Sequence, residues 1–139
     1  MSSRDEPDSL RADIVRRWKA ELFSADTVVA AVAVLVALPA GVVAAVLVDP
    51  RAVYPVWFAS AVGPSFGYWR GLRIEVDYAT AAKVGTGMAL TIALVTTAVL
   101  AIAIALPVST DTGILGAGAV GFLFGAFLSR VAFHRYAGR

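Results

Sequence analysis

Residues with reactive side chains are few in this chain, and their spacing builds no catalytic or metal-binding set. Cysteine is absent, and the single histidine, His134, lies among arginines near the C-terminus. A metal site needs several companion ligands, and a catalytic triad needs a nucleophile and a carboxylate beside the histidine. We therefore expect no enzymatic activity, no bound metal and no cofactor.

One segment has the spacing of a nucleotide-binding loop. Gly116, Gly118 and Gly121 fit the pattern GxGxxG, in which glycines let the backbone approach a pyrophosphate between a strand and a helix. Here the glycines lie inside a long apolar run and follow no soluble strand, so we interpret them as residues that pack helices. The formal net charge of +2 is too small to predict nucleic-acid binding.

The composition is that of a membrane protein. Hydrophobic residues make up 59% of the chain and charged residues 16%, whereas soluble domains contain about 25% charged residues. No charged residue or histidine occurs in Thr27–Val48 or in Val84–Val108, and uncharged apolar runs of this length are typical of membrane spans. The excess of arginine over lysine is typical of a prokaryote with a GC-rich genome. We expect an all-α polytopic protein in which residues 24–139 form one bundle of four transmembrane helices, at about 27–48, 52–69, 78–106 and 114–133.

An amphipathic helix is predicted before the first span. Residues 1–8 mix opposite charges with serine and proline and are expected to be disordered. In residues 9–23, apolar side chains recur at every fourth position while basic residues occupy other faces, a pattern typical of a helix on a membrane surface. The alternative is a short cytosolic helix that packs on its own bundle. The residues expected to contact anionic lipid headgroups are Arg16, Arg17, Lys19, Arg70 and Arg73.

Two stripes of small residues are the most regular feature of the spans. They occupy every fourth position in the second and fourth predicted spans, as Ala59, Gly63, Gly67, Gly71 and as Ala117, Gly121, Gly125, Ser129. This spacing places the residues of each stripe on one helix face and lets a second backbone approach closely. The simplest arrangement packs the two stripes against each other within one chain. In the alternative, one or both stripes face another subunit.

Two functions fit these features. None of the predicted spans carries an ionisable side chain at mid-membrane, although proton relays and ion-coupled carriers use such residues. The favoured hypothesis is a non-enzymatic scaffold or accessory subunit that associates through its glycine-rich faces. The alternative is a small oligomeric pore or carrier lined by backbone groups and hydroxyls. The expected partners are anionic lipid headgroups, and a second copy or a partner membrane protein, but no nucleic acid.

The distribution of basic residues predicts the topology of the chain in the cell membrane. If four spans cross, eleven of the twelve lysines and arginines lie on one side and Arg51 lies alone on the other, which places both termini in the cytoplasm. A cysteine introduced at Thr110 should then react only with a reagent added from the non-cytoplasmic side. Because the native chain has no cysteine, the label reports one position. Reaction from the cytoplasmic side alone would reverse the assignment.

Overall fold

The computed structural model describes residues 5–66 and 74–136, and within these ranges the chain is all-helical, as predicted. Three of the helices are long and apolar enough to cross a membrane, namely α2, α5 and α6, which indicates a multi-pass membrane protein. The elements in order are α1 (Asp5–Leu22), α2 (Ala25–Leu47), the 3-10 turn η1 (Pro50–Ala52), α3 (Val53–Val62), the 3-10 turn η2 (Gly63–Ser65), α5 (Tyr78–Ala105) and α6 (Thr110–Tyr136).

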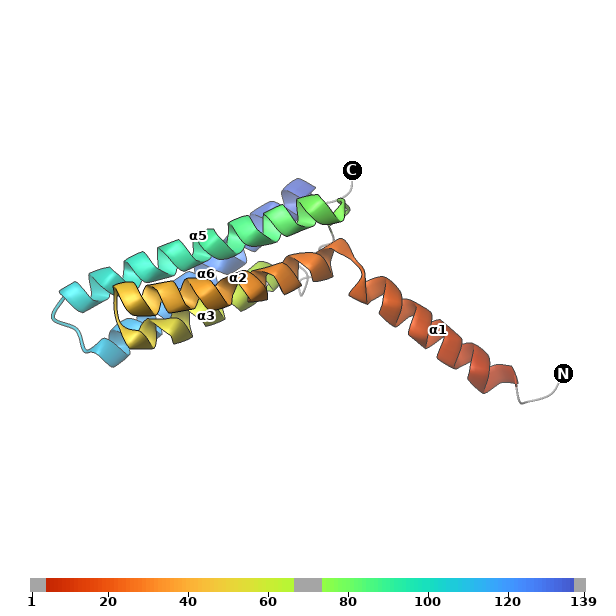
Figure 1. The fold of residues 1–139 in the computed structure, drawn as a ribbon, viewed down its shortest axis with the longest axis horizontal. Helices are drawn as coiled ribbons and strands as arrows, with labels where there is room; N and C mark the ends of the chain where they lie inside the picture. Colours follow the sequence, from red (N-terminus) through yellow and green to blue (C-terminus); the bar gives the residue numbers. More distant parts are fainter. Residues whose placement is uncertain (1–4, 67–73, 137–139) are drawn as a thin grey trace.

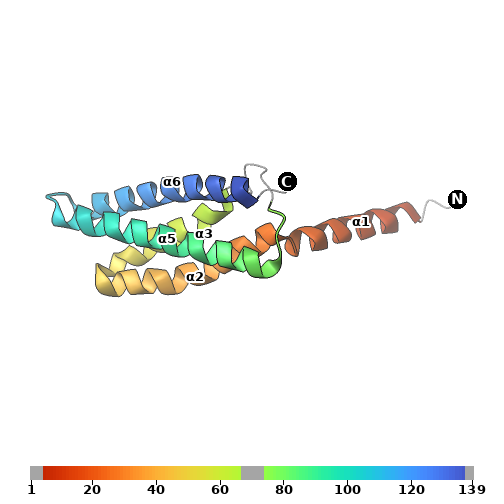
Figure 2. The same cartoon turned by 90° about the horizontal axis from the view of Figure 1, so that it is seen from above.

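The helices α2, α3, α5 and α6 lie side by side in an elongated bundle in which consecutive helices run in opposite directions, and α1 projects from it (Figure 1). Seen from above, α1 again extends beyond the end of the bundle where α2 and α5 begin (Figure 2). From Pro7 to Leu22, every residue of α1 is exposed. These residues of α1 therefore do not pack on the bundle, and the bundle begins after Ser24 with α2.

Short polar side chains begin the long helices. The Oγ of Ser24 accepts a hydrogen bond from the amide of Thr27 at 3.3 Å, at the start of α2. The carboxylate of Asp77 accepts hydrogen bonds from the amide and hydroxyl of Thr80 at 3.1 and 2.6 Å, which confirms the predicted start of α5. The hydrogen bonds from Thr80, led by that of its hydroxyl, lower the pKa of Asp77.

Two predicted boundaries are wrong at the helix N-termini. The first helix starts at Asp5, so residues 5–8 are helical, while residues 1–4 lie outside the described ranges. The last helix starts at Thr110 instead of about residue 114. It is capped by Ser109, whose Oγ accepts a hydrogen bond from the amide of Thr112 at 3.2 Å, and an acidic residue in the first turn suits the positive end of the helix dipole.

The second predicted span, residues 52–69, is not a single spanning helix. Its α-helical part, α3, has 10 residues and passes into the 3-10 turn η2 at Gly63. Proline has no amide to donate, so Pro64 cannot continue the α-helical ladder. Beside this break, the Oγ of Ser65 donates to the carbonyl of Val62 at 2.8 Å. The end of the predicted span lies outside the described residues.

Polar contacts mark the two ends of the bundle. At the end where α2 begins, the buried carboxylate of Asp26 accepts a hydrogen bond from the amide of Ile74 at 2.9 Å, and the hydroxyl of Tyr78 donates to the carbonyl of Phe23 at 2.6 Å. At the other end, the Nη1 of Arg51 lies 3.0 Å from the Oδ1 of Asp111. The chain between Arg51 and Ile74 thus connects opposite ends of the bundle.

Candidate helix-packing site

The backbones of α6 and η2 come into direct contact at Gly63 and Gly125. A Cβ added at Gly125 would lie 3.0 Å from the Cα of Gly63, and a Cβ added at Gly63 would lie 3.1 Å from the Cα of Gly125. The Cδ1 of Ile92 from α5 would be 3.1 to 3.2 Å from either added atom. Glycine at both positions therefore lets three segments meet at one point.

One helical turn away, Gly121 receives a side chain from each of two neighbours. An added Cβ would lie 2.1 Å from the Oγ1 of Thr96 and 3.1 Å from the Cβ of Ala59. The hydroxyl of Thr96 is fully buried against Gly121 and donates its proton to the carbonyl of Ile92 in its own helix at 2.7 Å. The small-residue face of α6 thus packs on both α3 and α5.

The last residue of the α6 stripe adds a polar contact to this interface. The Oγ of Ser129 donates to the carbonyl of Pro64 at 2.8 Å, and both residues are buried. At the other end of the stripe, Ala117 is fully buried in a cluster with Ala52, Val56 and Leu100. Interhelical hydrogen bonds such as that of Ser129 stabilise helix contacts in membranes by about 0.6 kcal/mol on average.

The structure brings six of the eight predicted stripe residues together within one chain. The six are buried, and they are Ala59, Gly63, Ala117, Gly121, Gly125 and Ser129; Gly67 and Gly71 lie outside the described residues. Residues of α6 and α5 pack on Ala59 and Gly63, and residues of α3, η2 and α5 pack on the α6 stripe. This part of the stripes is therefore not available to a second subunit. The contribution of these contacts to assembly stays a prediction.

The predicted headgroup ligands are placed only in part. Arg16, Arg17 and Lys19 are exposed on α1, where Arg16 forms an ion pair with Asp13. Arg70 and Arg73 lie outside the described residues. His134 is exposed in the last turn of α6, and within residues 5–66 and 74–136 no cluster of histidine, aspartate and glutamate could hold a metal ion.

Sequence reasoning missed the tightest backbone contact, between α5 and α2. A Cβ added at Gly85 would lie 2.7 Å from the carbonyl oxygen and 3.1 Å from the Cα of Val29. Both helices carry the same four-residue spacing of buried residues. These are Ala25, Val29, Ala33, Ala37 and Gly41 in α2, and Ala81, Gly85, Ala89 and Ala93 in α5. This signal is present in the sequence, but small residues are so frequent in both helices that no single face stands out.

We compared the chain with known protein families, curated proteins and solved structures. No protein-family model, curated protein or solved structure matches the chain.

We predict that Gly85→Ala destabilises the bundle. The new methyl group would clash with the backbone of α2, and a backbone, unlike a side chain, cannot change rotamer to relieve the clash. Overpacking of this kind costs about 1–3 kcal/mol. Gly87→Ala is the matched control, since it lies two residues away on the same helix and an added Cβ there has no atom within 4 Å. The measurement is the apparent Tm of the purified protein in detergent. Equal Tm values for the two variants would show that α2 and α5 do not approach closely at Gly85.

We also predict that Gly121→Leu lowers the apparent Tm in detergent, because Thr96 and Ala59 fill the space that the side chain needs. Gly116→Leu on the same helix should be mild, because Gly116 is exposed and has open space. Crosslinked oligomer yield should be the same for both variants, because the contact is within one chain. A loss of oligomer at unchanged Tm for Gly121→Leu would instead place the stripe between subunits.

Proposed function

We propose that the chain is a non-enzymatic membrane scaffold or accessory subunit in the cell membrane, with four crossings and both termini in the cytoplasm. Its bundle is the anchor, and α1 is the segment that it presents to the cytoplasmic surface. The observation that carries this proposal is the contrast between a bundle closed on itself by small residues and a fully exposed first helix.

The contacts at the two bundle ends support a fourth crossing. The α2 helix has 23 residues and, at 1.5 Å per residue, is about 34 Å long, enough to span the hydrocarbon core. The chain leaves its end at Pro50 and returns at Ile74 to the carboxylate of Asp26 at its start. The segment between them connects the same two ends of the bundle, and its described part contains only one short α-helix, α3, between the 3-10 turns η1 and η2.

The filled interior of the bundle favours an anchor over a pore within one chain. Ile92 packs against both of the facing glycines, Gly63 and Gly125, and Thr96 fills the space at Gly121. The hydroxyls of Thr91, Thr96 and Thr97 each donate to a carbonyl of their own helix at 2.7 Å. A conduction path needs polar groups that face a channel, so transport would require several copies around a shared axis.

The apolar stripe of α1 supports contact with the membrane surface. Leu10 is 64% exposed and Trp18 is 66% exposed, and Arg17 and Lys19 are exposed beside them. A helix with large apolar side chains on one face and cations on another binds where acyl chains meet anionic headgroups. Each basic residue near the surface contributes about 1 kcal/mol of attraction. This helix would hold the cytoplasmic face of the protein against the bilayer.

A spin label at Ile14→Cys tests the position of α1 in the full chain. In nanodiscs with phosphatidylglycerol, we expect the label to be reached by oxygen and shielded from a water-soluble nickel reagent, because Ile14 lies on the apolar stripe. Reversing three charges, in Arg16→Glu, Arg17→Glu and Lys19→Glu together, should expose the label to the nickel reagent, because the surface then repels the helix. Equal nickel access in both proteins would remove the membrane-surface role.

Ion flux through protein-containing vesicles decides between the scaffold and the oligomeric pore or carrier. The scaffold predicts the flux of protein-free vesicles, whereas flux that rises with protein density would establish the pore or carrier.

A further inference from the structure

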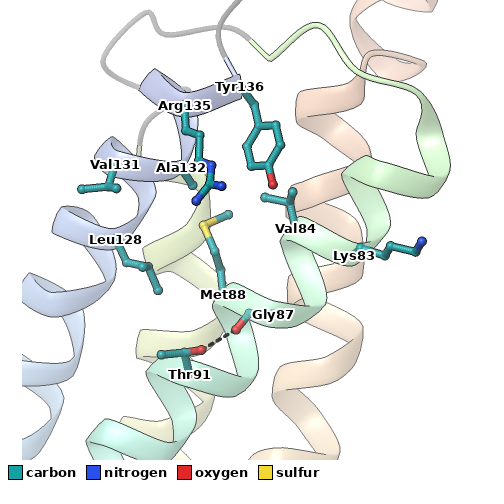
Figure 3. Close-up of a pocket in the computed structure, with 10 residues that line it drawn as sticks. All are labelled: Lys83, Val84, Gly87, Met88, Thr91, Leu128, Val131, Ala132, Arg135 and Tyr136. Atoms are coloured by element: carbon teal, nitrogen blue, oxygen red, sulfur yellow. Dashed lines mark hydrogen bonds between the residues drawn. The ribbon is translucent and has the colours of Figure 1, made fainter.

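A groove of about 300 Å³ lies between α5 and α6, at the end of the bundle where α1 leaves it (Figure 3). Arg135 and Tyr136 from the last turn of α6 and Lys83 from the first turns of α5 line its mouth. Met88 and Leu128 line it further along. Gly87 and Val131 are exposed at its edges, so the groove opens toward the outer surface of the bundle.

The polarity of the groove changes along its length. Its cations lie at the mouth, whereas from Gly87 to Thr91 and from Leu128 to Ala132 its lining carries no charge. The hydroxyl of Thr91 donates a hydrogen bond to the carbonyl of Gly87 at 2.7 Å (Figure 3). Its proton is therefore not available to a ligand in the groove. Lys83 and Thr91 are eight positions apart on α5, which corresponds to about 12 Å along the helix.

The cationic side chains at the mouth are available to an external anion. Figure 3 shows the guanidinium of Arg135 directed inward above Met88, and Lys83 extending outward on the far side of Val84. Both side chains are exposed. The ion pairs within the described residues join Arg16 to Asp13 and Arg51 to Asp49 and Asp111, so no described carboxylate neutralises either groove cation.

We infer that this groove binds one anionic phospholipid of the phosphatidylglycerol class. The guanidinium of Arg135 donates to the phosphate, because its planar fork matches phosphate oxygens. Lys83 adds a second positive charge at headgroup depth, and one acyl chain lies along Met88 and Leu128. A phospholipid has this same order of charge followed by hydrocarbon, whereas a free anion would leave the apolar part of the groove unused. The inference deepens the anionic-lipid contact of the proposed function by giving it a second, separate site.

Native mass spectrometry of the full chain in detergent, titrated with dioleoylphosphatidylglycerol, tests the site. We expect one tightly bound lipid per chain, and a dissociation constant about tenfold higher for Arg135→Gln, since a charge-assisted hydrogen bond is lost. Arg130→Gln is the matched control, because Arg130 is exposed on the same helix and does not line the groove. Dioleoylphosphatidylcholine should bind more weakly. Equal affinities for the two lipids, or for the two arginine variants, would overturn the inference.

A steric variant separates the groove from general surface charge. Gly87→Phe should abolish the tight binding without unfolding the protein, because an added Cβ has no atom within 4 Å and the side chain would fill the groove. Gly116→Phe, at a position equally open, should bind as wild type. Unchanged binding in Gly87→Phe, or displacement of the lipid by inorganic phosphate at equal concentration, would overturn the acyl-chain site. These variants leave α1 intact, so the result is independent of the spin-label experiment on α1.

Discussion

Close approach of helix backbones is the interaction on which the rest of this structure depends. In lipid, helices gain little from burying apolar surface, because the surrounding chains are equally apolar, so contact distance decides how strongly they associate. The bundle meets this constraint with glycine at three contacts, Gly63 against Gly125, Gly121 against Thr96, and Gly85 against Val29. Each contact joins a different pair of segments, and together they link α2, η2, α5 and α6.

The pairing of polar backbone groups is the second constraint on this structure. An unpaired amide or carbonyl is costly inside a bilayer. Threonine hydroxyls return to carbonyls of their own helix, and where Pro64 interrupts the ladder, Ser129 from α6 donates to its carbonyl at 2.8 Å. The same hydrogen bond joins the segment interrupted at Pro64 to α6. The point where the α-helix ends is therefore also a point where this segment is hydrogen-bonded to α6.

Both surfaces that we propose for lipid contact lie outside the bundle interior. The interior is filled by side chains from facing helices, and the residues that look most distinctive in the sequence are covered there. The exposed apolar stripe of α1 and the groove mouth at Arg135 both lie at the end of the bundle where α2 and α5 begin. The proposed contact with anionic lipid requires cations near this end of the bundle.

The sequence alone determined the all-helical class, the small-residue spacing and the start of α5 at Tyr78. Of the four spans that it predicted, three are long apolar helices in the structure. These properties depend on residues a few positions apart, which share one helix face or one helix turn. The break at Pro64 was visible, but its outcome was not, because a proline kinks, ends or tightens a helix according to what packs beside it. Only the tertiary structure decided which small residues matter: Gly85 meets the backbone of Val29 while Gly87, two residues away, faces open space. It alone also placed Lys83 and Arg135 at one groove, since the pairing of helix faces depends on how whole helices pack and not on local sequence.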